Sequence, residues 1–285
     1  MSYNLKRYSS SDGWEGRSPA KAMETVVSNS PDIVGFQEVN QKSGNGWDDY
    51  LPTLTANGYS QVKGTDSGAA HYVRQDIFYQ TAKFTELTKG TVFFKEAAVS
   101  LGVPNTESAD ESLDDRGVRG RSFTYVALRD KATGNDFLVV NVHLHYGGTG
   151  TGHEEDDKLR RYEIRTLLAW LETQTYTNVI VLGDMNSHYL TGQGKVNMKI
   201  YTDAGFALAC QTAAVKGDTG GTFVGWDEDT DTNLAKRKQW VFDYIMTKGN
   251  IDTTYYTVVD NKIDNGNTTY PSDHVPVLAR ISFTA

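Results

Sequence analysis

Residues 179–186 constrain the fold more than any other part of the sequence. They read Val-Ile-Val-Leu-Gly-Asp-Met-Asn, and four consecutive aliphatic residues, three of them β-branched, are typical of a strand buried on both faces. The glycine allows the backbone to turn sharply, and Asp184 and Asn186 follow at the strand end. Many α/β proteins carry their chemistry at such a position, although Asp and Asn are also common in ordinary turns.

Further segments with an apolar run or strict alternation predict strands, and segments with helical spacing lie between them. The predicted strands are residues 3–5, 33–36, 77–79, 84–94, 122–128, 137–145, 241–246 and 275–281, with 122–128 and 137–145 forming a hairpin. The predicted helices are residues 19–27, 48–56, 159–171 and a segment ending at 205, and the predicted loops are residues 97–121, 149–157 and 217–237. No linker or change in composition divides the chain, which predicts one domain over residues 1–285.

Composition excludes several classes of protein. The formal charge of −8, from 36 acidic and 28 basic residues, repels polyanions at long range and disfavours broad non-specific binding of nucleic acid. It does not exclude a nuclease, because local bases and a bound metal neutralise a few phosphates. Cys210 is the single cysteine, so an internal disulfide or a cysteine-based metal cluster is excluded. No apolar run has the length of a bilayer span and no signal peptide is visible.

Polar residues recur at or near the ends of the apolar strands. They are Asn4, Glu38, His143, Asp184 with Asn186, Asp243, and Asp273 with His274. Oxygen ligands from several strands are what Mg²⁺ requires, whereas a zinc site is less favoured without three histidines or a cysteine cluster. Carboxylates with two histidines suit metal-assisted hydrolysis of a phosphate ester, in which one group activates water and a cationic histidine stabilises the developing oxyanions.

Structural explanations exist for the same residues. Asn4 and Asp243 are also suited to satisfying buried backbone groups, a histidine on a strand is more often structural than catalytic, and Asp273-His274 also fits a turn. The joint occurrence of the residues favours a functional site over these separate explanations.

The motifs resemble those of the endonuclease/exonuclease/phosphatase superfamily, in that family's order and over nearly the whole chain. They are Tyr3-Asn4-Leu5, Gln37-Glu38-Val39, Asn141-Val142-His143-Leu144, Gly183-Asp184-Met185-Asn186, Phe242-Asp243-Tyr244-Ile245 and Ser272-Asp273-His274. The resemblance implies a four-layer α/β sandwich, in which two packed mixed β-sheets are flanked by helices, and a bacterial member of the family.

The resemblance also implies roles for individual residues. Glu38 would be the principal Mg²⁺ ligand, with Asn4 and Asp273 completing or supporting that site and Mn²⁺ as a substitute ion. Asp184 would orient or deprotonate the attacking water, and His274, oriented by Asp243, would stabilise the transition state or protonate the leaving group. Asn186 would hold the phosphate, His143 would contact it from the opposite side, and Arg121 would lie near it.

Three positions depart from the family pattern or add to it. His145 stands where many bacterial members have aspartate, and we expect an exposed strand-end histidine or one that lines the cleft. Asp76 is a candidate acidic partner for His143. Trp226, in a loop that resembles a substrate-side loop of the family, either contacts a leaving group or packs on its own loop.

The expected function is hydrolysis of a phosphodiester or phosphomonoester. A nuclease requires bases or stacking aromatics beside the cleft, and the candidate bases are Arg74, Arg119, Arg121, Lys236, Arg237 and Lys238. The alternative is a phosphatase or phosphodiesterase for inositol phosphates, phospholipid headgroups or small phosphate esters. Outside enzymes, the alternative is a catalytically silent binding module, which the retained Glu38, Asp184 and His274 disfavour. No stable protein partner or transmembrane segment is implied, and we expect a secreted or cell-surface protein whose leader is absent from this chain, or otherwise a cytoplasmic one.

Overall fold

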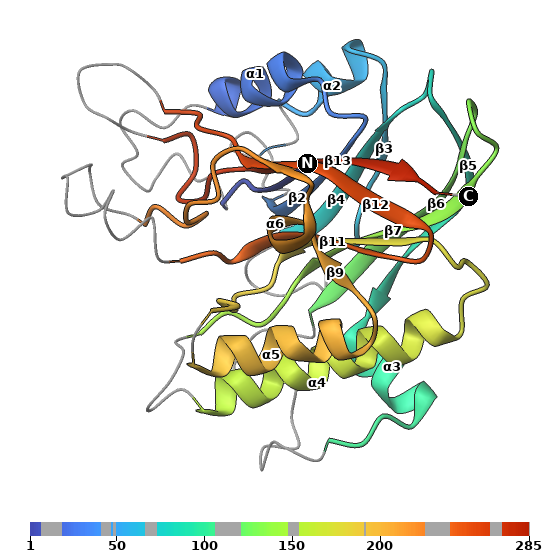
Figure 1. Ribbon diagram of the computed structural model, residues 1–285, viewed down its shortest axis with the longest axis vertical. Helices are drawn as coiled ribbons and strands as arrows, with labels where there is room; N and C mark the ends of the chain where they lie inside the picture. The colour runs from blue at the N-terminus through green and yellow to red at the C-terminus, as the bar shows by residue number, and fades with distance from the viewer. Residues whose placement is uncertain are drawn as a thin grey trace.

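The computed structural model describes residues 1–6, 19–40, 47, 50–65, 73–105, 121–147, 154–190, 192–225, 240–262 and 270–284. In these residues the chain forms two mixed β-sheets that pack face to face and carry helices on their outer faces (Figure 1). This is the α/β sandwich that the motifs predicted.

The first sheet has seven strands in the order β10-β12-β13-β1-β2-β4-β3. Its strands are β1 (Ser2–Asn4), β2 (Ile33–Asn40), β3 (Tyr59–Val62), β4 (Val73–Gln80), β10 (Val215–Lys216), β12 (Ile251–Val258) and β13 (Val277–Phe283). β1 runs parallel to β2 and antiparallel to β13, so the sheet is mixed.

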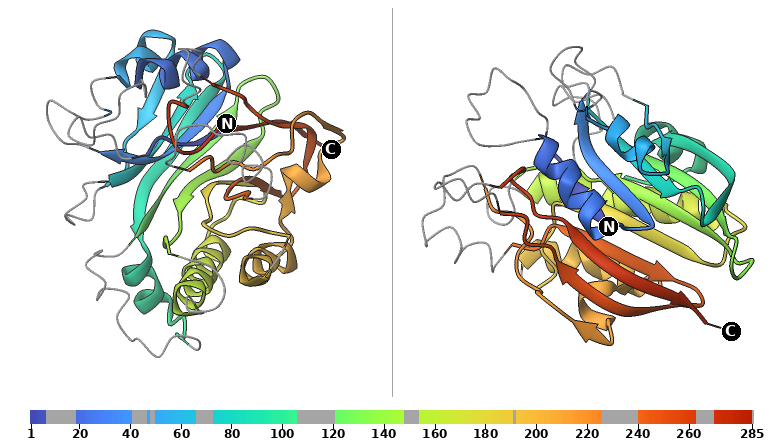
Figure 2. Two further views of the ribbon diagram at one scale, coloured as in Figure 1. Left: turned by 90° about the vertical axis from the view of Figure 1, so that its left-hand side faces the viewer. Right: turned by 90° about the horizontal axis from the view of Figure 1, so that it is seen from above.

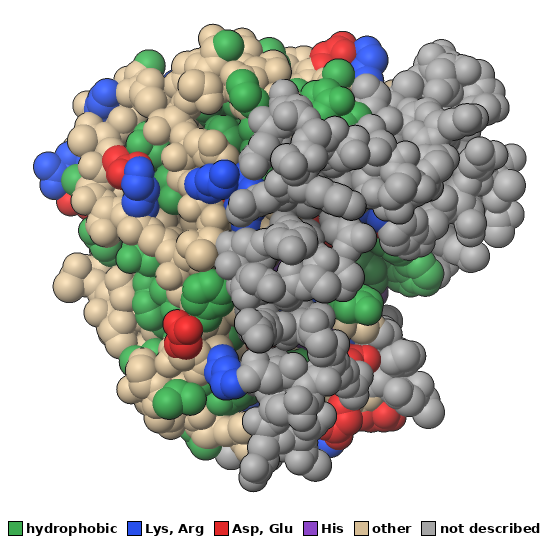
Figure 3. All heavy atoms as spheres, turned by 180° about the vertical axis from the view of Figure 1, so that it is seen from behind, with side chains coloured by type: hydrophobic (Ala, Val, Ile, Leu, Met, Phe, Trp, Pro, Cys, Tyr) green, Lys and Arg blue, Asp and Glu red, His purple; other side chains and the backbone are tan. Residues whose placement is uncertain are grey.

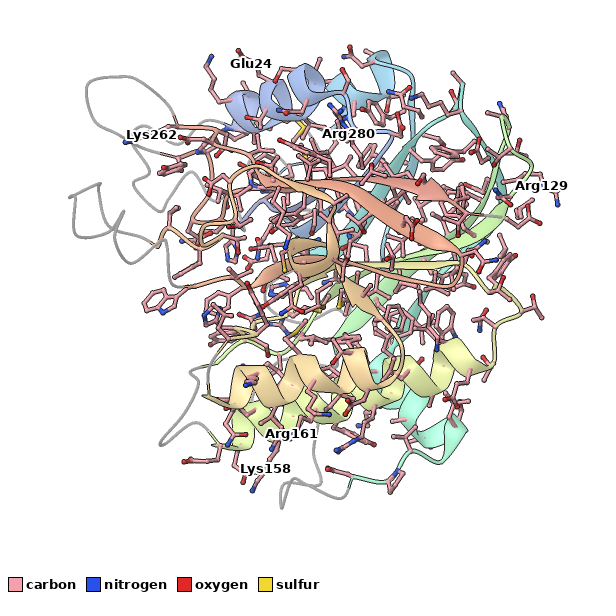
Figure 4. All side chains as sticks on the ribbon, viewed as in Figure 1. Glu24, Arg129, Lys158, Arg161, Lys262 and Arg280 are labelled. Atoms are coloured by element: carbon pink, nitrogen blue, oxygen red, sulfur yellow. The ribbon has the colours of Figure 1, made fainter. Side chains whose placement is uncertain are left out.

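The second sheet has six strands in the order β5-β6-β7-β8-β11-β9. Its strands are β5 (Phe84–Phe93), β6 (Ser122–Asp130), β7 (Asp136–His143), β8 (Val179–Asp184), β9 (Ala207–Leu208) and β11 (Asp243–Lys248). β7 and β8 are parallel, whereas β6 and β7 form the predicted antiparallel hairpin, and Arg129 marks the turn end of that hairpin (Figure 4).

Helices form the outer layers on both sides. α1 (Pro19–Asn29) and α2 (Pro52–Ala56) lie on one side of the sheets, and α3 (Phe94–Leu101), α4 (Glu154–Glu172) and α5 (Gly192–Asp203) lie on the other (Figures 1 and 2). The short α6 (Ala209–Thr212) packs beside β11 and β12. None of the helices that the structure describes is long and apolar enough to cross a membrane.

The core lies between the sheets and beneath the helices. β1 and β2 of the first sheet face β7 and β8 of the second. The sheets pack closely at Gly35, where a Cβ atom would collide with the side chains of Leu182 and Asn141. The aliphatic residues of β8 are all buried. The prediction that this strand is covered on both faces is therefore confirmed.

Several predicted elements differ from those observed. Residues 97–121 were expected to form a loop and Phe94 to end a strand, but Phe94–Leu101 is α3, because Phe94, Ala97 and Ala98 at helical spacing bury one face and Gly102 ends the helix with a φ of 64°. Residues 149–157 were also expected to be a loop, but α4 begins at Glu154, since four acidic residues in its first turn favour a helix N-terminus.

Other boundaries moved by a few residues. The strand expected at 137–145 ends at His143, the one expected at 241–246 begins at Asp243, and the helix expected from residue 48 begins at Pro52. β3 and β12 were not expected. In β12 the alternating buried residues Ile251, Thr253, Tyr256 and Val258 are interrupted by an irregular pairing between Thr253 and Tyr255, which obscures the period of two in the sequence.

Candidate active site

The predicted site residues meet where strands of both sheets end. In the second sheet His143 is in register with Asp184, and Asp184 is in register with Asp243, so the three residues form a row across β7, β8 and β11. Asn4 ends β1 of the facing sheet, and β1 contacts β8 and β11 across the sandwich. The site therefore lies at the seam between the two sheets.

Asp184 is the centre of this cluster. Its Oδ1 accepts a hydrogen bond from the Asn186 backbone N–H at 2.8 Å, and its Oδ2 accepts one from Asn4 Nδ2 at 2.9 Å. Gly183 makes the position possible, because it has a φ of 149° and a Cβ atom there would collide with the Val142 carbonyl. Burial raises the pKa of Asp184 to about 7, an effect that the positive charge of His274 opposes.

His274 and Asp243 form a buried pair. The distance between His274 Nδ1 and Asp243 Oδ2 is 2.7 Å, and His274 Nε2 lies 3.7 Å from Asp184 Oδ2. Burial lowers the pKa of His274, but Asp243 and Asp184 outweigh this effect and raise it to about 10. The ring is therefore an imidazolium at neutral pH, with Nδ1–H donating to Asp243 and Nε2–H directed towards Asp184.

His143, unlike His274, is neutral. Its Nε2 lies 3.4 Å from Asp184 Oδ2, and its side chain is buried. Burial, Arg121 and His274 hold the pKa of His143 well below its usual value. The site therefore holds one neutral and one charged histidine on the same carboxylate.

Asn4 links Asp184 of the second sheet to Glu38 of the first sheet. Its Nδ2 also donates to Glu38 Oε1 at 3.1 Å, while its Oδ1 accepts the Lys6 N–H at 2.9 Å. Glu38 has a φ of 59° and lies where the pairing of β2 with β4 is interrupted. Such a break redirects a side chain, and a non-glycine residue in this conformation costs on the order of 1 kcal/mol.

Asp273 lies next to Lys6. The distance between Lys6 Nζ and Asp273 Oδ2 is 3.4 Å, and both side chains are buried. Ser272 Oγ donates to the Asn4 backbone carbonyl at 2.8 Å, which fixes this loop against β1. The sequence interpretation did not include Lys6, although a lysine two residues after the strand-end asparagine is a visible signal.

Arg121 and Asn186 both bind backbone carbonyls at the end of β7. Arg121 Nη1 donates to His143 O at 3.1 Å and to Leu144 O, and Asn186 Nδ2 donates to Leu144 O at 3.0 Å. Their expected contacts with a phosphate stay predictions.

The expectation of an exposed His145 is wrong. The residue is 7% exposed, and its Nε2 lies 3.0 Å from Asp156 Oδ1 of α4. Burial, followed by the charge of Arg121, lowers the pKa of His145 to about 4. Asp156 was expected in a loop, so this partner was not visible in the sequence.

The structure also gives Asp76 and Arg74 partners other than those expected. Asp76 is placed with Arg74, whose Nε donates to both of its oxygens at 2.7 and 3.0 Å, and Asp76 also accepts hydrogen bonds from Gln61 Nε2 and the Gly64 N–H. Arg74 is fully buried, so it does not serve as a surface base for nucleic acid. The other candidate substrate contacts lie outside the described residues; they are Arg119, Trp226, Lys236, Arg237 and Lys238.

The donor atoms at the seam fit a divalent cation. Asp184, Asp243 and His274 each offer one ligand atom within 4.8 Å of the others, and Asp243 Oδ1 is buried without a hydrogen-bond partner among the described residues. As an imidazolium, His274 has no lone pair for a metal ion, so the ligands that this group could offer are the carboxylate oxygens of Asp184 and Asp243, with Glu38 linked to Asp184 through Asn4. Oxygen ligands suit Mg²⁺ and Mn²⁺ better than Zn²⁺.

Comparison with known proteins agrees with this geometry. Residues 1–274 match the model of the Endonuclease/Exonuclease/phosphatase family. Among curated proteins, the CCR4-Not complex 3'-5'-exoribonuclease subunit Ccr4 of Aspergillus oryzae is 30% identical over 141 residues, which cover 47% of this chain and 18% of that protein. The chain thus spans less than a fifth of that relative's length.

Solved structures show the same fold. The endonuclease/exonuclease/phosphatase of Bacteroides vulgatus has a TM-score of 0.72 at 21% identity, covering 99% of this chain and 97% of that one. The mannosyl-6-phosphatase of Bacteroides thetaiotaomicron has a TM-score of 0.69 at 20% identity, covering 99% and 98%. The chain belongs to the endonuclease/exonuclease/phosphatase family, whose members are hydrolases of phosphate esters.

Proposed function

We propose that the protein is a divalent-metal-dependent phosphoesterase whose catalytic centre is the cluster around Asp184. The observation that carries the proposal is the placement of His274 between Asp243, at 2.7 Å, and Asp184, at 3.7 Å. This arrangement provides a buried carboxylate for a water molecule and a fixed cation for negative charge that develops on phosphate oxygens.

The proposed roles follow from the charge states. Asp184 orients the attacking water and accepts its proton, for which a pKa of about 7 is well suited. His274, held by Asp243, stabilises the transition state or protonates the leaving group. Neutral His143 contacts the phosphate from the other side of Asp184, and Asn186 and Arg121 approach the phosphate from the end of β7.

Glu38 is proposed as the principal ligand of the metal ion, with Asp273 and Asn4 supporting that site. A bound ion would neutralise charge on the phosphate and would lower the pKa of a water molecule that it binds. Asn4 contributes by holding Glu38 and Asp184 together through its amide nitrogen. Because both sheets supply residues, we treat residues 1–285 as one catalytic domain.

Nucleic acid is the substrate class that we place first. The Phe223 ring lies 5.1 Å from the His274 ring. Phe223 in turn contacts Trp240 and Phe242, which stack on each other at 6.5 Å with an interplanar angle of 15°. Trp240 is 41% exposed. Exposed aromatic rings next to a phosphate site stack on unpaired bases, which agrees with the exoribonuclease relative.

Small phosphate esters are the second candidate. On the face seen in Figure 3, the Lys and Arg side chains are scattered among acidic and apolar ones and form no continuous basic surface over the described residues. A phosphate on a small sugar or lipid headgroup does not need such a surface, and one structural neighbour is a mannosyl-6-phosphatase.

A substrate panel distinguishes these candidates. The protein is incubated with single-stranded RNA, single-stranded and plasmid DNA, sugar phosphates, inositol phosphates and sphingomyelin, each with Mg²⁺, Mn²⁺ or EDTA. We expect metal-dependent hydrolysis that EDTA abolishes, with RNA as the best substrate. Hydrolysis of sugar phosphates alone would favour the second candidate, and binding without hydrolysis would identify a silent module.

A further inference from the structure

The segment His143-Leu144-His145 is fastened to the second sheet and its covering helix by side chains rather than by strand pairing alone. At its start, Arg121 Nη1 donates to the carbonyls of His143 and Leu144, and Asn186 Nδ2 donates to the carbonyl of Leu144. The Leu144 N–H donates to the Asp184 carbonyl at 3.0 Å. The backbone directly after the His143 side chain is thus held against the strand that carries Asp184.

Helix α4 holds the end of the same segment. Glu163 Oε2 accepts the His145 backbone N–H at 2.7 Å, and Arg160 Nη1 donates to the His145 carbonyl at 3.1 Å. Both side chains are buried, at 3% and 0% exposure. Figure 4 places Lys158 and Arg161 on the outer side of the same helix. Glu163 and Arg160 instead belong to the buried face of the helix, which contacts residue 145.

Charge explains why a carboxylate lies at this position. Burial raises the pKa of Glu163 to about 7, whereas the charges of Arg121 and Arg160 and the hydrogen bond from the His145 N–H oppose this increase and favour the carboxylate. A buried guanidinium without a compensating negative charge is costly, and Arg160 has a second partner in Asp157 Oδ1 at 2.7 Å. Among the negative charges around Arg121, that of Glu163 stabilises the guanidinium most, followed by those of Glu38 and Asp184. Without the charge of Glu163, Arg121 would be attracted more strongly towards Glu38 and Asp184 of the proposed catalytic centre.

We propose that Glu163 is a positioning residue of the active site, which holds the His145 N–H and balances the charge of Arg121 so that the His143 imidazole stays against Asp184. This inference rests on the proposed function. Glu163 does not touch the reacting atoms; it acts through Arg121 and the backbone of residues 143–145. The helical spacing in the sequence indicated only the apolar stripe of α4, and this charged part of its inner face was not predicted.

The test compares two substitutions with a control on the same helix. Glu163→Gln keeps the side-chain length and a carbonyl oxygen for the His145 N–H but removes the charge, whereas Glu163→Leu removes both. Glu172→Gln makes the same chemical change at an exposed position of α4. Each variant is assayed for kcat and KM on bis(p-nitrophenyl) phosphate with Mn²⁺, and the imidazole signals of His143 are recorded by ¹⁵N NMR of the metal-free protein.

We expect Glu163→Gln to lower kcat about tenfold with KM within about twofold, because His143 is displaced from its position in the transition state, whereas Asn186 and the proposed metal ligands stay in place. We also expect its His143 signals to move, and Glu172→Gln to match the wild type in both measurements. Glu163→Leu should show larger changes where it folds. Unchanged His143 signals and kcat in Glu163→Gln would overturn the proposal. If the wild type hydrolyses no phosphate ester, the proposed function fails, and the NMR comparison still decides whether Glu163 positions His143.

Discussion

His274 and Asp243 reach each other from different sheets, and the 2.7 Å contact between them sets the charge of the imidazole. Asp243 begins a strand of the second sheet, whereas His274 lies in the loop that leads to β13 of the first. His274 is charged because Asp243 and Asp184 raise its pKa, whereas His143 is neutral because burial and the charges of Arg121 and His274 lower its pKa. At this scale, function depends on partners that are far apart in sequence.

Asp243→Asn tests this account of the charge state. Removing the carboxylate charge should lower the pKa of His274, and kcat should fall by roughly 10²–10⁴-fold, because the ring loses its orientation and its positive charge at neutral pH. NMR titration of the His274 ring and steady-state kinetics measure the two effects. A variant with wild-type kcat and an unshifted His274 titration would contradict the assignment.

His145 gives the protein a predictable sensitivity to acid. Its pKa is about 4 in the folded protein and near 6.5 when exposed, so below pH 6.5 the unfolded chain binds a proton that the folded chain does not. Stability from this residue is complete above pH 6.5 and is lost as the pH falls towards 4, by roughly 3 kcal/mol at most.

Denaturant unfolding of the wild type and His145→Gln between pH 4 and 7 measures this effect. The difference in unfolding free energy between the two proteins should be largest at pH 7 and should shrink as the pH falls. A pH-independent difference would show that the pKa of His145 is the same in the folded and unfolded states, which contradicts the effect of burial.

Among the secondary-structure elements, strands with a continuous apolar run were predicted from the sequence. Strands without a clear apolar pattern, which are recognisable only from their pairing with neighbouring strands, were missed. β8 has a continuous aliphatic run, so its position and its polar end were predictable. β12 reads Ile-Asp-Thr-Thr-Tyr-Tyr-Thr-Val, without a regular alternation of apolar and polar residues, and its pairing with β13 is irregular between Thr253 and Tyr255. α3 and the start of α4 were missed because polar and acidic residues there resemble a loop until helix capping and packing are considered.

The residues of the candidate site also fall into a predictable group and an unpredicted group. The strand-end residues were predictable because each lies at or near one end of an apolar run, but their partners were not. Arg74 was expected at the surface because its buried partner Asp76 was assigned elsewhere, and His145 was expected to be exposed because Asp156 was placed in a loop. Burial of a charged residue is decided by a partner from another element, which a local pattern does not reveal.

Gly183→Ala tests the fit between β7 and β8. The glycine has a φ of 149°, and a Cβ atom would collide with the Val142 carbonyl, so we expect a loss of roughly 3 kcal/mol from combined strain and overlap. Gly134→Ala is the matched control, with a φ of 76° and nothing within 4 Å of the added Cβ, and should cost about 1 kcal/mol. Urea denaturation of both variants measures the losses, and equal losses would contradict the steric account.

For the whole molecule, the two sheets form one site only where they meet, so metal binding should depend on residues from both. Asn4, Glu38 and Asp273 come from the first sheet and from the loop before β13, whereas Asp184 and Asp243 come from the second sheet. This division explains why each strand-end motif alone carries little information and why the set of them identifies the family.

Glu38→Ala tests the proposed metal ligand. We expect the affinity for Mn²⁺, measured by isothermal titration calorimetry without substrate, to fall by roughly 100-fold, because a charged oxygen ligand is lost. Glu24→Ala is the control, since this exposed residue of α1 lies far from the strand ends (Figure 4). If Glu38→Ala bound Mn²⁺ as tightly as Glu24→Ala, another carboxylate would have to be the principal ligand.

The most direct test of the central claim is the rate of metal-dependent phosphodiester hydrolysis by Asp184→Asn. The substitution keeps the shape of the side chain but removes the carboxylate that Asn4, His143 and His274 surround. We predict that kcat falls by roughly 10³-fold or more while circular dichroism and thermal unfolding show a folded protein. A folded Asp184→Asn variant with a kcat within tenfold of the wild type would place the catalytic centre elsewhere.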